Sequence, residues 1–92
     1  VMTLKDAAEN WYVYMIKCKD ETLYTGITTD VKRRLAEHVK GRSKAARYLK
    51  GRGPLKLVFQ SNACTRQEAL KLEHTIKKLP RARKILLTCI KR

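Results

Sequence analysis

Two short segments rich in aromatic and β-branched residues stand near the start of the chain, with three polar residues between them. Residues 11–18 read WYVYMIKC and residues 22–28 read TLYTGIT. This composition predicts two β-strands. If Cys18 pairs with Thr22 across the break, the strands form a hairpin whose side chains alternate between two faces. One face would then carry Tyr12, Tyr14, Ile16, Tyr24 and Gly26, and the other Trp11, Val13, Met15, Leu23, Thr25 and Ile27.

A helix is predicted directly after the hairpin. Asp30 can cap its first turn, and Gly41 can end it after Lys40. Apolar residues recur every four positions along this segment, which is typical of a helix with one buried stripe. The predicted stripe consists of Val31, Leu35 and Val39.

The second half of the chain continues the alternation of helix and strand. A shorter helix is predicted over 44–50, a turn over 51–54 and a third strand over 55–61. Thr65 and Glu68 have the spacing of a capping box, which opens a helix that reaches about Leu79. Residues 81–90 can add a final helix.

The predicted order of elements is ββααβα, followed by the final helix. It indicates a small α+β domain in which helices flank a three-stranded, mostly antiparallel sheet. A chain of 92 residues fits one domain. Residues 11–92 are therefore expected to form that domain, with residues 1–10 as a flexible lead-in.

The charge balance points to a polyanionic partner. Lys and Arg number 22 against 8 Asp and Glu, for a formal net charge of +14. A nucleic acid is the natural partner, because each neutralised phosphate releases a condensed counterion; the alternative is a solvated basic surface. A membrane is disfavoured, because no apolar run reaches the roughly 20 residues that span a bilayer.

The cysteines give no sign of a metal site or of a disulfide framework. Cys18, Cys64 and Cys89 are odd in number and include no CxxC pair. This spacing disfavours zinc ribbons and paired disulfides. Reduced thiols are typical of the cytoplasm, which is the predicted location.

Three polar residues fall where the predicted helices should bury them. At about 100° per residue, Arg34 and His38 lie at the edge of the first stripe, and Glu73 lies about 40° from Ala69 in the third helix. A desolvated charge needs a partner. For Arg34 the alternatives are a bound anion or a side chain that extends to water. For Glu73 they are a metal ion or an ordinary salt bridge, and spacing alone leaves both open.

These residues stand in an order that resembles a known family. The segments YVY at 12–14 and YTG at 24–26 resemble the paired tripeptides of GIY-YIG nucleases. Arg34 and His38 follow with the family's spacing, and Glu73 resembles its metal-binding glutamate. The resemblance covers roughly residues 11–80 and is strongest to small stand-alone bacterial members of the family.

The resemblance implies a metal-dependent endonuclease that hydrolyses DNA phosphodiester bonds with low sequence specificity, like relatives in DNA repair. Tyr24 would deprotonate the attacking water, and Tyr14 would hydrogen-bond near it. Arg34 would stabilise charge on the phosphate. His38 would assist proton transfer or hold the phosphate, and Glu73 would bind one Mg²⁺ or Mn²⁺.

The chain also departs from the family pattern. Tyr12 stands where many members have Gly, and Thr25 where many have Ile. Several nucleases of the family carry an Asn after the glutamate, whereas no Asn follows Glu73 here. The alternative function is therefore a weak or inactive DNA- or RNA-binding module, with the tyrosines as platforms for stacked bases.

Basic residues gather around the second predicted helix, close in sequence to the proposed site. A cluster of this kind can follow a phosphate backbone, or it can be a solvated face. A protein partner that directs the domain to its target is also compatible with the sequence. The candidate nucleic-acid contacts are Arg42, Lys44, Arg47, Lys50 and Arg52.

Overall fold

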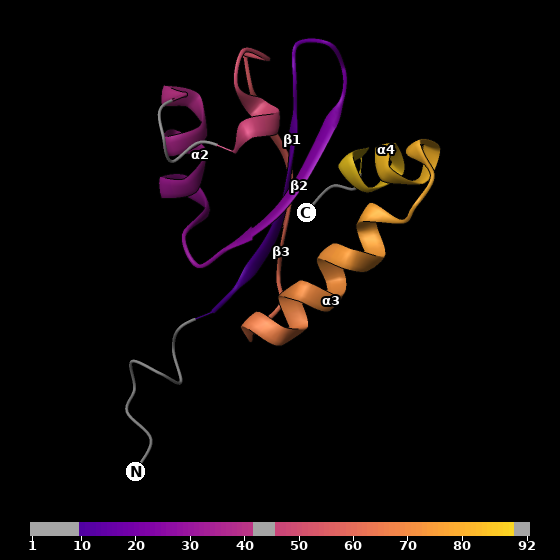
Figure 1. Ribbon diagram of the computed structural model, residues 1–92. Helices are drawn as coiled ribbons and strands as arrows, with labels where there is room; N and C mark the ends of the chain where they lie inside the picture. Colours follow the sequence, from indigo (N-terminus) through magenta and orange to yellow (C-terminus); the bar gives the residue numbers. More distant parts are fainter. Residues whose placement is uncertain (1–9, 42–45, 90–92) are drawn as a thin grey trace.

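A three-stranded antiparallel sheet forms the centre of the molecule. The computed structural model describes residues 10–41 and 46–89, so residues 1–9 of the predicted lead-in lie outside the described part. The strands are β1 (Tyr12–Lys17), β2 (Leu23–Thr28) and β3 (Lys56–Asn62). Their order in the sheet is β2-β1-β3, with β1 in the middle (Figure 1).

The first two strands form the predicted hairpin with the predicted register. Tyr14 stands opposite Gly26, and Ile16 opposite Tyr24. The Cys18 amide donates to the Thr22 carbonyl at 2.9 Å, which closes the hairpin. The two tyrosines that resemble the family signature therefore lie on the same face of the sheet.

A β-bulge changes the register on the other side of β1. Met15 stands opposite Phe59, but the next residue, Ile16, stands opposite Leu57. Val58 is the extra residue. Both Val58 and Phe59 pack against the cluster around Met15, while Leu57 packs on the opposite side of the sheet.

Four helical elements complete the α+β fold: α2 (Val31–Lys40), the 3₁₀ turn η1 (Arg47–Leu49), α3 (Arg66–Lys77) and α4 (Arg81–Cys89). Asp30 caps α2 by accepting from the Arg33 amide at 3.0 Å. Gly41 ends α2 at a φ of 67°, in the left-handed region that favours glycine. Thr65 caps α3 through the Glu68 amide at 3.1 Å.

The second predicted helix is wrong for the residues that the structure describes. Residues 44 and 45 lie outside them, and the rest form only the single 3₁₀ turn of η1. The chain turns away after Lys50, at Gly51 with a φ of 75°. The final helix, in contrast, is confirmed as α4.

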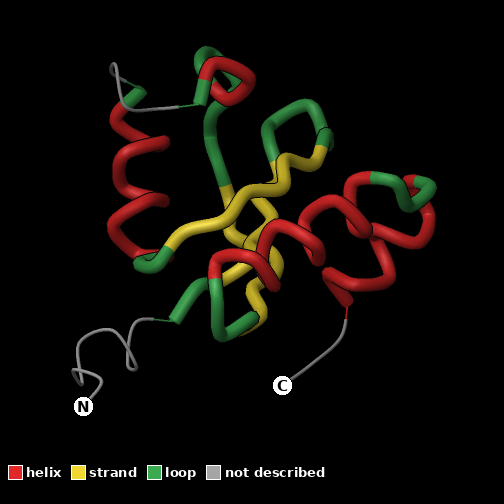
Figure 2. Tube along the Cα trace, turned by 60° about the horizontal axis from the view of Figure 1, so that its bottom comes forward, coloured by secondary structure: helices red, strands yellow, loops and turns green. Residues whose placement is uncertain are grey.

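The helices cover both faces of the sheet. One cluster joins Val13 and Met15 to Ala69 and Ile76 of α3. The other joins Tyr14 and Ile16 to Leu49 of η1, with α2 residues packed against it. Figure 1 and Figure 2 accordingly show α2 on one side of the strands and the α3–α4 pair on the other.

The prediction that Val39 belongs to the buried stripe of α2 is wrong. Val31 and Leu35 pack on the tyrosine cluster, but Val39 is 62% exposed. His38, predicted at the edge of the stripe, is buried in its place at 2% exposure. Across residues 10–41 and 46–89, no helix has the length and apolar character to cross a membrane.

Candidate active site

Three aromatic side chains from different elements meet on the α2 side of the sheet. The ring centroids of Tyr14 on β1 and Tyr24 on β2 are 6.3 Å apart. The ring of His38 on α2 lies 6.0 Å from that of Tyr14 and 5.6 Å from that of Tyr24. Hairpin register and helix packing thus bring together three residues that the sequence predicted as a site.

Gly26 leaves room for the Tyr14 ring. A Cβ atom at position 26 would lie 2.6 Å from the Tyr14 hydroxyl oxygen and 2.8 Å from its Cζ atom. It would also lie 3.1 Å from the Tyr24 ring. Any other residue would therefore displace the phenol, so glycine is required here for close approach.

His38 is hydrogen-bonded at both ring nitrogens. The Ala46 amide, which can only donate, points to Nδ1 at 3.1 Å. A neutral imidazole that accepts at Nδ1 carries its proton on Nε2. Nε2 lies 2.9 Å from the Tyr14 hydroxyl oxygen, so His38 is the donor in that bond. The Tyr14 hydroxyl proton is then directed to another acceptor.

The surroundings of His38 and Tyr14 determine whether each side chain is protonated. Burial, and after it the charge of Arg34, lower the pKa of His38 to about 4, against the opposing effect of Glu37. Burial and the neighbouring Tyr24 raise the pKa of Tyr14 far above its ordinary value, against the opposing effect of Arg34. At neutral pH His38 is neutral and Tyr14 keeps its proton. A hydrogen bond with Tyr24 also raises the pKa of Tyr14, as expected when Tyr14 is the donor.

Arg34 lies beside the tyrosines and has a carboxylate partner. Its Nη1 atom donates to Glu37 Oε1 at 2.8 Å, and it also interacts with Tyr14. Glu37 accepts a second, weaker contact from Arg33 at 3.6 Å. The sequence analysis missed Glu37, although its i,i+3 spacing from Arg34 is the usual geometry of a helical ion pair.

Glu73 belongs to the helix beside Tyr24's strand. α3 packs against both β2 and β1. The Glu73 carboxylate is only 19% exposed and pairs with Lys77 at 3.2 Å. Of the two alternatives for this carboxylate, the salt bridge is present in the structure. α3 packs on the face of the sheet that carries Val13 and Met15, whereas the phenols pack on the opposite face with α2. Within the described residues no hydrogen bond or ion pair joins Glu73 to the phenols, and its metal role stays a prediction.

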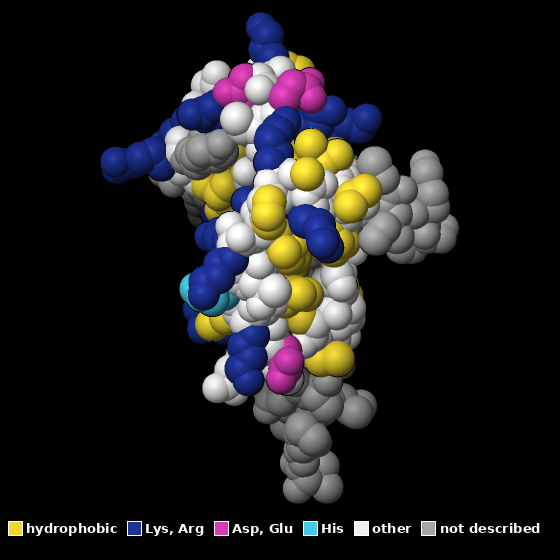
Figure 3. Space-filling model, turned by 90° about the vertical axis from the view of Figure 1, so that its right-hand side faces the viewer, with side chains coloured by type: hydrophobic (Ala, Val, Ile, Leu, Met, Phe, Trp, Pro, Cys, Tyr) yellow, Lys and Arg dark blue, Asp and Glu magenta, His cyan; other side chains and the backbone are white. Residues whose placement is uncertain are grey.

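The candidate nucleic-acid residues are only partly described. Arg42 and Lys44 lie outside the described residues. Arg47 and Lys50 are exposed, and Arg52 donates to Asp20. Figure 3 shows that basic side chains also spread over the α3–α4 side of the molecule, around an apolar patch. Positive charge alone therefore does not locate the interface.

Comparison with known proteins shows which family the chain resembles over most of its length. The GIY-YIG catalytic domain profile matches residues 10–85. A UPF0213 protein from Cronobacter sakazakii is 51% identical over 83% of this chain and 78% of its own length. One from Vibrio cholerae is 46% identical over 89% and 80%. The solution structure of a UPF0213 protein from Bacillus halodurans is 44% identical, with a TM-score of 0.56 over 89% of this chain and 85% of that one.

Proposed function

This chain belongs to the GIY-YIG family, and from that premise we propose that it is a metal-dependent endonuclease that hydrolyses DNA phosphodiester bonds with low sequence specificity. A GIY-YIG catalytic domain implies nuclease-type chemistry on a nucleic acid. The observation that carries the proposal is the cluster of two phenols, an imidazole and a guanidinium on one face of the sheet. The net charge of +14 favours a polyanionic substrate.

Tyr24 is the proposed general base. The other phenol, Tyr14, is held in its protonated form by burial and is hydrogen-bonded to Tyr24. The Tyr24 oxygen, as a phenolate or through a bridging water, would take a proton from the attacking water. The water oxygen then bonds to phosphorus as the bond to the leaving oxygen breaks, and the leaving oxygen takes a proton from solvent.

Arg34 is the proposed phosphate contact. Its side chain is 27% exposed, and its Nη1 atom is paired with Glu37. A guanidinium presents five donors, enough for Glu37 and for phosphate oxygens at once. Fixed donors aimed at a phosphate stabilise the charge that develops during displacement.

The residues present fit one divalent ion of the Mg²⁺ type. No group of three or more His, Cys, Asp or Glu in the described part of the chain could hold a metal. Mg²⁺ does not need such a cage, because it keeps several waters and binds through one or two carboxylates plus substrate phosphates. Glu73 is the proposed carboxylate. An ion bound there would stabilise negative charge on the leaving oxygen.

A cleavage panel tests this proposal. The protein is incubated with labelled single-stranded, duplex, flap and branched DNA, with Mg²⁺, with Mn²⁺ and with chelator. We expect cleavage that the chelator abolishes. Tyr24→Phe should slow it by orders of magnitude, and Glu73→Ala should abolish it while DNA binding persists. Tyr12→Phe, which removes a hydroxyl from the same hairpin, is the matched control. Full activity of either site variant contradicts the role assigned to that residue.

A second candidate is a binding module that cuts poorly or not at all. The observation that favours it is the ion pair that already occupies the Glu73 carboxylate, together with the missing Asn after it. The same panel, with a labelled single-stranded RNA added, separates the two functions. Salt-sensitive binding without metal-dependent cleavage of any DNA or RNA substrate would establish the module and reject the nuclease.

A further inference from the structure

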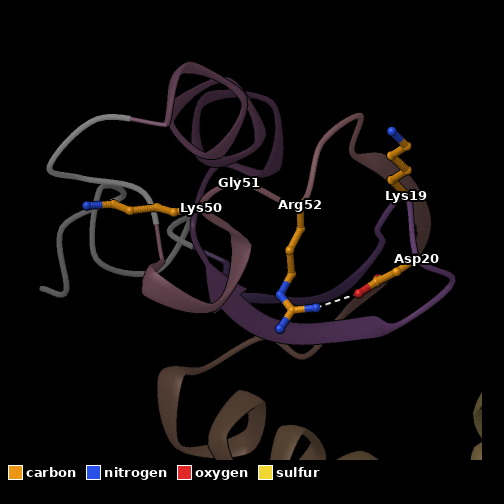
Figure 4. A pocket seen from close by; sticks show the side chains of 5 residues that line it. All are labelled: Lys19, Asp20, Lys50, Gly51 and Arg52. Carbon is orange, nitrogen blue, oxygen red and sulfur yellow. Dashed lines mark hydrogen bonds and ion pairs between the residues drawn. The ribbon is translucent and has the colours of Figure 1, made fainter.

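A second feature of the molecule is a hollow of about 550 Å³, here called the turn pocket. It lies between the β1–β2 turn and the segment after η1, and it is lined by Lys19, Asp20, Lys50, Gly51 and Arg52 (Figure 4). One backbone hydrogen bond and one side-chain hydrogen bond join the two segments that line it. The Lys19 amide donates to the Arg52 carbonyl at 3.0 Å, and the Arg52 guanidinium donates to the Asp20 carboxylate.

The turn pocket carries excess positive charge. Three of its five residues are cations and one is an acid. The adjacent acid, Glu21, is paired with Lys17 at 3.1 Å. In Figure 4 the side chains of Lys50 and Lys19 point away from each other on the two sides of the hollow, and Arg52 lies between them with its guanidinium directed to Asp20. Cations spread along a hollow in this way fit a chain of phosphates better than a single anion.

The turn pocket adjoins a second hollow, which His38 of the tyrosine cluster helps to line. This smaller hollow, of about 140 Å³, is also lined by Lys50 and Gly51, which line the turn pocket as well. Lys19 follows Ile16, the residue paired with Tyr24, by three positions, so the turn that lines the pocket is close in sequence to the strands that carry the two tyrosines.

We propose that the turn pocket binds the sugar–phosphate backbone of a DNA strand. Its place on the path of a strand that is cut at the tyrosine cluster rests on the proposed function, whereas the binding itself does not. Lys19 and Lys50 contact phosphates on either side of Arg52. Asp20 holds Arg52 in place and at the same time opposes the approaching phosphates.

The first test is the salt dependence of binding. Binding of a labelled single-stranded DNA is measured in chelator, so that the DNA stays uncut, over a series of NaCl concentrations. Each lost phosphate contact on a single strand lowers the slope of log K against log salt by ~0.7. Lys19→Ala/Lys50→Ala should therefore lower it by about 1.4. The control, Lys71→Ala/Lys78→Ala, removes the same charge from exposed positions of the α3 segment. Equal slopes for the two double variants would overturn the proposal.

The second test uses a substitution in the turn pocket that should strengthen DNA binding. Asp20→Asn removes the opposing charge but keeps the side-chain oxygen that accepts from the Thr22 amide and hydroxyl. We expect tighter DNA binding in the wild-type background and a much smaller gain in the Lys19→Ala/Lys50→Ala background. An equal gain in both backgrounds would contradict the proposal.

Inorganic phosphate distinguishes a DNA-backbone site from a site for a free anion. At matched ionic strength, phosphate and NaCl should displace the DNA from the wild type equally. Specific displacement by phosphate, lost in the Lys19→Ala/Lys50→Ala variant, would reassign the turn pocket to a free anion. A failure of every cleavage assay, with the binding results intact, would reject the proposed nuclease and leave the pocket assignment standing.

Discussion

The Nε2 atom of His38 lies 2.9 Å from the Tyr14 hydroxyl oxygen and donates its proton to it. The direction follows from the other side of the ring, where the Ala46 amide already donates to Nδ1. A histidine held in this way has no vacant nitrogen with which to accept a proton. In this arrangement the ring orients a phenol, while the proton transfer or phosphate contact that the family resemblance implies for His38 stays a prediction.

Acid should destabilise the fold through His38. Its pKa is about 4 in the folded protein, whereas an unfolded histidine titrates near 6.5. Between these values the unfolded chain binds the proton and the folded chain does not. The free energy of unfolding should thus fall as the pH drops from about 6.5 to about 4, by at most ~1.4 kcal/mol per pH unit. Denaturant unfolding at several pH values measures this decline.

His38→Gln should flatten the decline, because glutamine does not titrate. His74→Gln, at an exposed position of α3, is the control and should leave the decline as in the wild type. If His38→Gln loses stability with acid as steeply as the wild type, another group is responsible.

The positioning role of His38 predicts a difference between two substitutions. His38→Ala removes both hydrogen bonds, and a misplaced catalytic group can cost on the order of 10²-fold in rate. Glutamine can accept from Ala46 and donate to Tyr14 with one amide, so His38→Gln should recover most of the lost kcat. If His38 itself transferred a proton, glutamine would be as inactive as alanine. Single-turnover cleavage of the substrate that the panel identifies measures both variants.

Gly26→Ala should damage the site and the fold together. The new methyl group would lie 2.6 Å from the Tyr14 hydroxyl oxygen, and overpacking of this kind costs about 1–3 kcal/mol. The phenol must move, so cleavage should fall more than stability alone explains. Gly53→Ala, where no atom lies within 4 Å of the new Cβ, is the control. Denaturant unfolding and cleavage are measured side by side, and wild-type cleavage by Gly26→Ala would show that Tyr14 need not sit there.

Glu37→Gln should strengthen DNA binding. Glu37 pairs with Arg34 at 2.8 Å and opposes a phosphate that approaches the same guanidinium. Removal of that charge should make the free energy of DNA binding more favourable by about 1 kcal/mol, which is about fivefold in affinity. Glu68→Gln makes the same change of net charge at an exposed site in the first turn of α3. Equal affinities for the two variants, measured by fluorescence anisotropy in chelator, would argue against a phosphate at Arg34.

The hairpin and helix ends were predictable because they depend on local rules. A short turn and a period of two fix which residues share a face, and the tyrosines accordingly meet. The prediction that Val39 is buried was wrong for a geometric reason. Residues spaced by four drift about 40° per step around a helix, so the third member of the stripe rotates toward water and His38 takes the inner position.

The sequence did not decide which groups pair with the charged residues. The sequence left two alternatives open for each residue: a bound anion or a side chain that extends to water for Arg34, and a metal ion or a salt bridge for Glu73. In the structure each has a partner within four positions on its own helix. The turn pocket was missed for the opposite reason. Its pair, Asp20 and Arg52, is separated by 32 residues, and only the folded chain places the two loops together.

Lys77 competes with a metal ion for the Glu73 carboxylate, which its Nζ atom approaches to 3.2 Å. If Glu73 binds Mg²⁺, Lys77→Ala should lower the Mg²⁺ concentration that half-saturates cleavage, because the ion no longer displaces a lysine. Direct Mn²⁺ binding, followed by calorimetry without DNA, should tighten in parallel and does not depend on activity. Lys71→Ala, at an exposed position of the same helix, removes an equal charge and is the control. If the two variants respond alike, the effect is one of overall charge, and Glu73 loses its assignment as the metal ligand.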